Sequence, residues 1–150
     1  MITCVSQPTG LILRRYAQFV IDRLLVGIPA FVLLFVAVIL AANMPKGDGR
    51  IATAYTSAAL FLLLLVAGNW FIEVWVPHRW LGGTPGMRWL GLRVVTEKGE
   101  TPAFRSYMIR WLMAVVDGYL LGLVGALAIA FSPRHQRFGD MVARTLVVRR

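Results

Sequence analysis

A chain of 150 residues is long enough for one domain, but a mean hydropathy of +0.68 with 58% hydrophobic residues excludes an ordinary soluble composition. A net charge of +9 would be compatible with binding to nucleic acid. The bases, however, lie at the ends of apolar segments rather than along one helix face, so we expect no nucleic-acid partner. Cys4 is the only cysteine, which excludes an intrachain disulfide.

Two apolar windows, residues 17–42 and 51–76, satisfy the rule that about 20 apolar residues span a bilayer. They predict an antiparallel transmembrane hairpin. The first window is too long for a cleaved signal core and follows no basic leader, so we expect it to be retained. Lys and Arg are frequent before it and in the loop 77–105. By the positive-inside rule, the N-terminus and this loop face the cytoplasm.

A third apolar segment, 108–131, is interrupted, and its course is open. Three crossings would place the C-terminus outside, against the positive-inside rule, because the tail carries five arginines. Either the segment breaks near Asp117-Gly118 or at Gly122 and Gly125 and returns, or it crosses once with a tilt. Two β-branched stretches, 90–95 and 145–150, predict a small cytoplasmic sheet and favour the return.

These elements predict an all-α membrane protein of one domain, residues 1–150. It consists of a transmembrane helical hairpin, a third apolar helical segment that is re-entrant or crossing, and a small cytoplasmic β element.

Two acids lie in similar surroundings inside apolar segments. Asp22 closes RYAQFVID and Asp117 closes RWLMAVVD, each seven residues after Arg15 or Arg110. An ionised carboxylate near a membrane helix centre costs roughly 2.5–3.5 kcal/mol and therefore needs a partner. Gln18 is one turn before Asp22 and within reach. If the two helices lie side by side, the two carboxylates share a depth and can hold a proton or a cation.

Glu73 is a third acid able to reach this pair, and it follows Asn69 by four residues. The plainer interpretation is an interfacial acid beside tryptophans. For Asp22 and Asp117, the alternative is a buried ion pair or hydrogen bond that fixes helix register. The sequence has no Ser, His and Asp grouping, no metal-ligand spacing and no phosphate-binding loop, so we expect no enzyme, no metal and no cofactor.

Three motifs, RYAQFVID, TPGMRWLGLRVV and SPRHQRFGDMVARTLVV, resemble those of the RDD family of small bacterial membrane proteins, over most of the chain. By this resemblance Arg15, Asp22 and Asp140 are the arginine and two aspartates of the family name. The loop motif corresponds to Thr84, Pro85, Gly86 and Arg88. Met87 replaces the usual Lys, and Arg144 replaces a usual Gly, which puts a tight turn before Thr145 in doubt.

The resemblance implies a multi-pass protein of the bacterial cytoplasmic (inner) membrane. It also implies a candidate ion-exchange activity, since some family members exchange sodium, lithium or potassium for protons. Asp140 lies in the tail. There a salt bridge with Arg15, Arg88 or Arg137 would tie the tail to the start of the first helix. Such a bridge is structural and does not mark an ion path.

Two functions remain open. One is a homo-oligomeric monovalent-cation/proton antiporter in which Asp22 and Asp117 bind the ions and Glu73 relays protons. The other is a non-transporting scaffold or accessory subunit that binds a partner protein or anionic lipid through the cytoplasmic loop and tail. In the second case the charged residues hold the bundle together, namely Arg15, Asp22, Arg110, Arg137 and Asp140.

Overall fold

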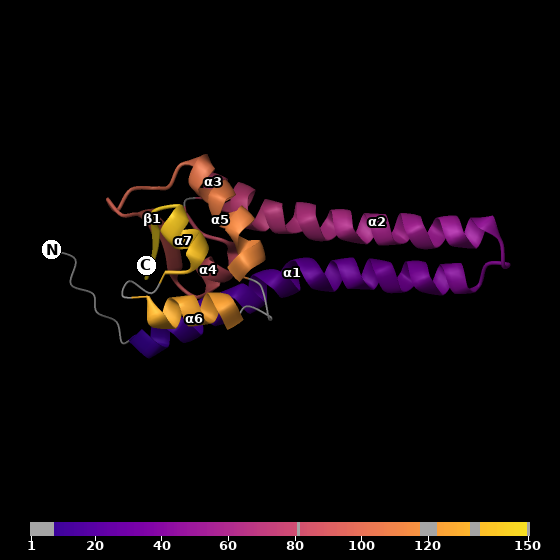
Figure 1. The fold of residues 1–150 in the computed structure, drawn as a ribbon, viewed down its shortest axis with the longest axis horizontal. Coiled ribbons are helices and arrows are strands. Elements are labelled where there is room, and N and C mark those ends of the chain that lie inside the picture. The colour runs from indigo at the N-terminus through magenta and orange to yellow at the C-terminus, as the bar shows by residue number, and fades with distance from the viewer. Residues whose placement is uncertain (1–7, 81, 118–122, 133–135, 150) are drawn as a thin grey trace. The chain divides into compact units, whose positions relative to one another are not determined.

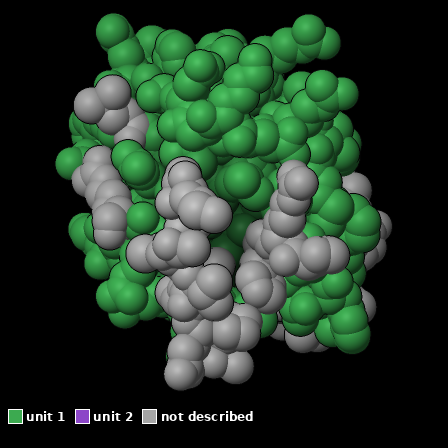
Figure 2. All heavy atoms as spheres, turned by 90° about the vertical axis from the view of Figure 1, so that its left-hand side faces the viewer, with its two compact units in different colours: residues 1–22, 71–150 green, residues 23–70 purple. Residues whose placement is uncertain are grey.

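The computed structural model describes residues 8–80, 82–117, 123–132 and 136–149, which are mostly helical (Figure 1). The chain divides into two compact units, and Figure 2 shows one of them, in green. One unit comprises residues 23–70, and the other comprises residues 1–22 and 71–150. We call them the hairpin unit and the sheet unit.

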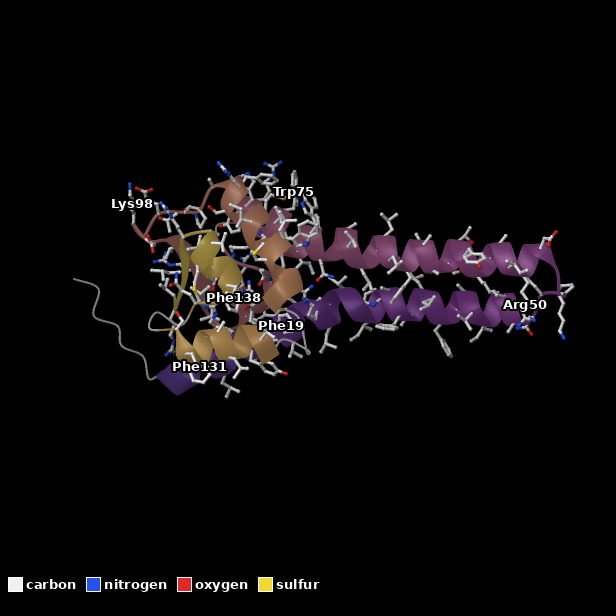
Figure 3. The ribbon with its side chains drawn as sticks, viewed as in Figure 1. Phe19, Arg50, Trp75, Lys98, Phe131 and Phe138 are labelled. Atoms are coloured by element: carbon white, nitrogen blue, oxygen red, sulfur yellow. The ribbon has the colours of Figure 1, made fainter. Side chains whose placement is uncertain are left out.

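The hairpin unit consists of most of α1 (Pro8–Ala42) and all of α2 (Asp48–Trp70), which run antiparallel (Figure 1). A short loop joins them, and Arg50 lies at this loop end (Figure 3). Large apolar side chains are exposed along both helices, as at Phe35 (65%) and Leu63 (62%). Helices of this length and composition that bury so little apolar surface are suited to lipid.

Two stretches of the described chain, Ile12–Ala42 and Asp48–Arg79, are long and apolar enough to cross a membrane. They contain the predicted windows 17–42 and 51–76, so the two long apolar helices are confirmed. Within the hairpin unit, Phe31 and Phe61 pack edge to face with ring centroids 5.1 Å apart. The Arg23 guanidinium donates to the Asn69 side-chain oxygen. These contacts join the two helices of the hairpin.

In the sheet unit, the helix widens around Glu73. A π-helical turn, η1 (Phe71–Trp75), is followed by the short helix α3 (Val76–Arg79). Pro77 lies at the start of α3 and has no N–H to donate to the Glu73 carbonyl, which is the i−4 partner of an α-helix. Loss of this bond explains why the regular helix gives way to a wider turn at this point.

The small sheet pairs β1 (Leu92–Thr96) with β2 (Thr145–Arg149) in antiparallel register, with Val94 opposite Val147. The predicted pairing of 90–95 with 145–150 is therefore confirmed, although β1 begins two residues later. Gly91 explains the shift, because its φ of +67° belongs to a turn. Because two strands cannot pair across a bilayer, the observed pairing is compatible with a loop and tail on one side of the membrane. This is what the re-entrant prediction requires.

The third apolar segment is divided between α5 (Phe104–Asp117) and α6 (Leu123–Phe131). A predicted break at Gly125 is wrong, because α6 continues through that residue. The predicted break near Asp117-Gly118 falls where the described residues of α5 end, so it stays a prediction. Gly118 and Gly122 lie outside the described residues. The re-entrant course through the membrane remains a prediction.

The core of the sheet unit mixes apolar and polar side chains. Tyr107, Met87 and Leu92 are fully buried, and so are Asp140 and Thr145. Asp140 belongs to the short helix α7 (Phe138–Val142), which directly precedes β2. A charged side chain at the centre of a small core requires close partners.

Candidate functional site

Asp140 is positioned by the first turn of α7. Its Oδ2 accepts the backbone N–H of Arg137 at 3.2 Å, so the carboxylate caps the helix to which it belongs. The negative charge at the N-terminus of α7 also complements the helix dipole. The local sequence RFGD therefore fixes the carboxylate before any distant partner is considered.

Two arginines from distant parts of the chain bind this carboxylate, one to each oxygen. Arg15 on α1 donates from Nη2 to Oδ2, and Arg110 on α5 donates from Nη1 to Oδ1. All three side chains are buried. The Arg137 Nε is 3.8 Å from Oδ1 and adds a third positive charge. One carboxylate thus joins α1, α5 and α7.

The same network reaches the sheet through Thr145, the first residue of β2. Arg110 Nη1 also donates to Thr145 Oγ1 at 3.0 Å. Gln136 Nε2 donates to the Thr145 backbone oxygen at 2.9 Å. Both partners are buried, so each bond satisfies a group that would otherwise be costly to remove from water. The network therefore fixes the start of β2 relative to α5.

Burial alone raises the pKa of Asp140, but the guanidinium groups of Arg110, Arg15 and Arg137 outweigh burial and hold that pKa well below its usual range. Burial lowers the pKa of Arg110 to about 10, partly opposed by Asp140. Both groups are therefore charged at neutral pH. A buried pair in this state is strongly damaged when one partner is removed.

A second buried carboxylate, Asp22 on α1, is held by neutral donors. Gln18 Nε2 donates to Oδ2 at 2.6 Å, as predicted for the i, i+4 pair. Thr84 Oγ1 donates to Oδ2 at 2.5 Å, and the Gly86 N–H donates to Oδ1 at 2.8 Å. Within the described residues, Asp22 forms no salt bridge.

The loop motif supplies two of these donors because of its local geometry. Thr84 is the N-cap of α4 (Pro85–Trp89) and accepts the Met87 N–H at 3.2 Å while donating to Asp22. A Cβ at Gly86 would lie 2.8 Å from Asp22 Oδ1 and 2.9 Å from the Gln18 backbone oxygen. Only glycine permits this approach of α4 to α1.

The remaining predicted residues are placed as follows. Arg15 and Arg110 both pair with Asp140. Glu73 is buried in η1. Its negative charge partly opposes the lowering of the Arg110 pKa that burial causes. The Asp117 side chain lies outside the described residues, so its predicted proximity to Asp22 remains a prediction.

Of the three predicted partners of Asp140, Arg15 forms a hydrogen-bonded salt bridge and Arg137 a longer one. Arg88 does not pair with Asp140, since its guanidinium lies over the Trp80 ring. No sequence pattern indicated Thr145 or Gln136. Thr145 accepts from Arg110, 35 residues away, and Gln136 donates to a backbone oxygen. In the part of the chain described, no group of three His, Cys, Asp or Glu side chains is arranged to hold a metal.

Comparison with known proteins agrees with the motifs. The model of the RDD family matches residues 9–144. The chain is 26% identical over 153 residues to the uncharacterized protein YxaI of Bacillus subtilis (strain 168), covering 96% of this chain and 99% of YxaI. No solved structure matches the chain. The match and the two long apolar helices identify a membrane protein.

Proposed function

We propose that this chain, which belongs to the RDD family, is a non-transporting scaffold of the bacterial inner membrane. Its apolar hairpin anchors it, and its sheet unit, placed on the cytoplasmic side with the N-terminus, presents a fixed basic surface. Assembly into a homo-oligomer is part of this proposal. An enzymatic activity is not.

The observation that supports a scaffold is the use of the family's charged residues. Asp140 is fully buried, and each of its oxygens accepts a hydrogen bond from a different arginine. Asp22 accepts three hydrogen bonds from groups of the chain itself. A carboxylate that exchanges ions must release such partners on each cycle, whereas a structural carboxylate retains them.

The test is proton flux in proteoliposomes that contain the purified protein and a pH-sensitive dye, pulsed with sodium, lithium or potassium. We expect the wild type to give no more flux than protein-free liposomes. Flux coupled to any of the three cations, and lost in Asp22→Asn protein that remains folded, would contradict the scaffold.

A second candidate, monovalent-cation/proton antiport, is favoured by Glu73. This acid is buried in a π-helical turn inside a stretch long enough to cross a membrane. Such turns occur often at functional sites. In this alternative Glu73 carries the proton, and Asp22 and Asp117 complete the ion path. The positive charge of Arg110 interacts with Glu73.

The two candidates separate on Glu73→Gln. If the protein is an antiporter, this variant abolishes coupled flux and leaves thermal unfolding in detergent close to that of the wild type. If it is a scaffold, there is no flux to lose in either protein.

A further inference from the structure

Two arginines of the sheet unit lie over tryptophan rings where the second membrane-spanning stretch ends. The Arg79 Cζ is 5.3 Å from the Trp75 ring centroid, and the Arg88 Cζ is 5.7 Å from the Trp80 ring centroid. The four side chains are exposed, Trp80 by 58%. We call Trp75, Arg79, Trp80 and Arg88 the basic-aromatic rim; Figure 3 shows Trp75 beside α3.

The rim arginines are charged groups without an acidic partner. Among the described residues, neither Arg79 nor Arg88 forms a salt bridge. Each guanidinium lies over an indole ring, and this contact restricts its motion. A guanidinium held in this way is suited to bind a phosphate by two parallel hydrogen bonds.

The position of Arg88 is fixed by the buried carboxylate described above. Arg88 belongs to α4, and two residues earlier the Gly86 N–H donates to Asp22. Thr84 donates to the same carboxylate. The loop motif therefore holds Arg88 in place from its buried side, whereas the arginine itself remains exposed.

The place of the rim along the chain indicates the ligand. The spanning stretch Asp48–Arg79 ends at one rim arginine, and tryptophans at this level of a membrane protein lie among lipid headgroups. The same unit has five further exposed basic residues: Arg93, Lys98, Arg105, Arg144 and Arg149. Positive charge and indole rings together match an anionic headgroup above an acyl chain.

We propose that the basic-aromatic rim binds the phosphate of an anionic phospholipid. This inference rests on the proposed scaffold function and names the ligand that its surface takes. The arginines bind the phosphate, and the tryptophans hold the arginines and contact the glycerol and upper acyl carbons.

The experiment uses full-length protein in nanodiscs of phosphatidylcholine and measures energy transfer from tryptophan to dansyl-labelled phosphatidylglycerol or dansyl-labelled phosphatidylcholine. We expect wild-type protein to prefer phosphatidylglycerol, and Arg79→Gln/Arg88→Gln to lose about tenfold of that preference. Arg79→Lys/Arg88→Lys keeps the charge and should retain most of it. The matched control is Lys46→Gln/Arg50→Gln, which removes two bases from the loop end of the hairpin and should leave the preference unchanged.

Each result decides the proposal. Equal binding of the two lipids by the wild type, or equal loss in the rim and loop variants, would overturn it. The double glutamine variant changes only exposed side chains, so unchanged thermal unfolding in phosphatidylcholine would show that a loss is not misfolding. Coupled ion flux by the wild type would contradict the scaffold but leave the lipid preference measurable, so the two failures are distinguishable.

Discussion

Residues 23–70 expose most of their large apolar side chains, whereas the sheet unit buries charged ones. In the hairpin unit α2 has no buried residue, and Leu63 is 62% exposed. In the sheet unit Asp140, Arg15 and Arg110 are almost inaccessible to solvent. Lipid stabilises the first kind of surface without specific partners, whereas the second is stable only when every charge is paired.

From this difference we expect mutations in the sheet unit to reduce stability more than mutations in the hairpin unit. Replacing a buried polar residue of the sheet unit leaves another buried group without its partner. This lowers the free energy of unfolding far more than the loss of one apolar contact. A conservative change on the lipid-facing hairpin removes little.

Asp140→Asn should lower the free energy of unfolding by about 3–5 kcal/mol, because three arginines then face each other without a carboxylate. The measurement is SDS-titrated unfolding of the purified protein in mixed micelles. Asp48→Asn, at the exposed start of α2, is the matched control and should change stability by less than about 0.5 kcal/mol. Equal stability of the two variants would contradict the expected difference between the sheet unit and the hairpin unit.

Acid should weaken the sheet unit through the same carboxylate. The pKa of Asp140 is depressed in the folded state, so its contribution is complete above its unfolded pKa of about 4 and is lost as the pH falls further. Unfolding measured between pH 7 and pH 2 should therefore show declining stability below about pH 4. Asp140→Asn should show a smaller decline over the same range. Parallel curves for the two proteins would contradict this assignment.

Gly86→Ala should destabilise the protein by about 2 kcal/mol, because the new Cβ would lie 2.8 Å from Asp22 Oδ1 and α4 must shift. Gly27→Ala is the control in α1, where an added Cβ meets nothing within 4 Å. It should be neutral or stabilising, since alanine favours helix. Thermal unfolding in detergent distinguishes the two, and equal effects would mean that α4 does not approach α1 closely.

Arg144→Gly should give the smallest effect and the opposite sign, a gain of about 1 kcal/mol. Arg144 has a φ of 51° directly after α7, where glycine is free of strain. Arg144→Ala removes the charge but keeps the strained backbone, so it should give no gain. A gain in both variants would assign the effect to charge.

The sequence predicted the elements better than their partners. Hydropathy gave the hairpin, and β-branched stretches gave the pairing of β1 with β2, because both signals are local. The turn at Arg144 forms despite the replacement of glycine, which the sequence had put in doubt. Local signals carry no information on how a residue pairs across the fold.

The buried network shows where such reasoning ends. Helical spacing placed Gln18 beside Asp22 correctly. Spacing placed Arg15 and Arg110 two turns before Asp22 and Asp117 and predicted no direct contact with them; both arginines bind Asp140, which is 125 residues from Arg15 and 30 from Arg110. Only the family motif drew attention to Asp140, because a short exposed-looking run, RFGD, has no hydrophobic pattern that indicates burial.

The central claim is that the family's arginine and second aspartate are structural partners. A double-mutant cycle of Arg15→Met and Asp140→Asn, followed by SDS-titrated unfolding in mixed micelles, tests it most directly. We predict that the double variant is more stable than the sum of the single losses implies, with a coupling energy above about 1.5 kcal/mol. Additivity within about 0.5 kcal/mol would contradict a structural pair.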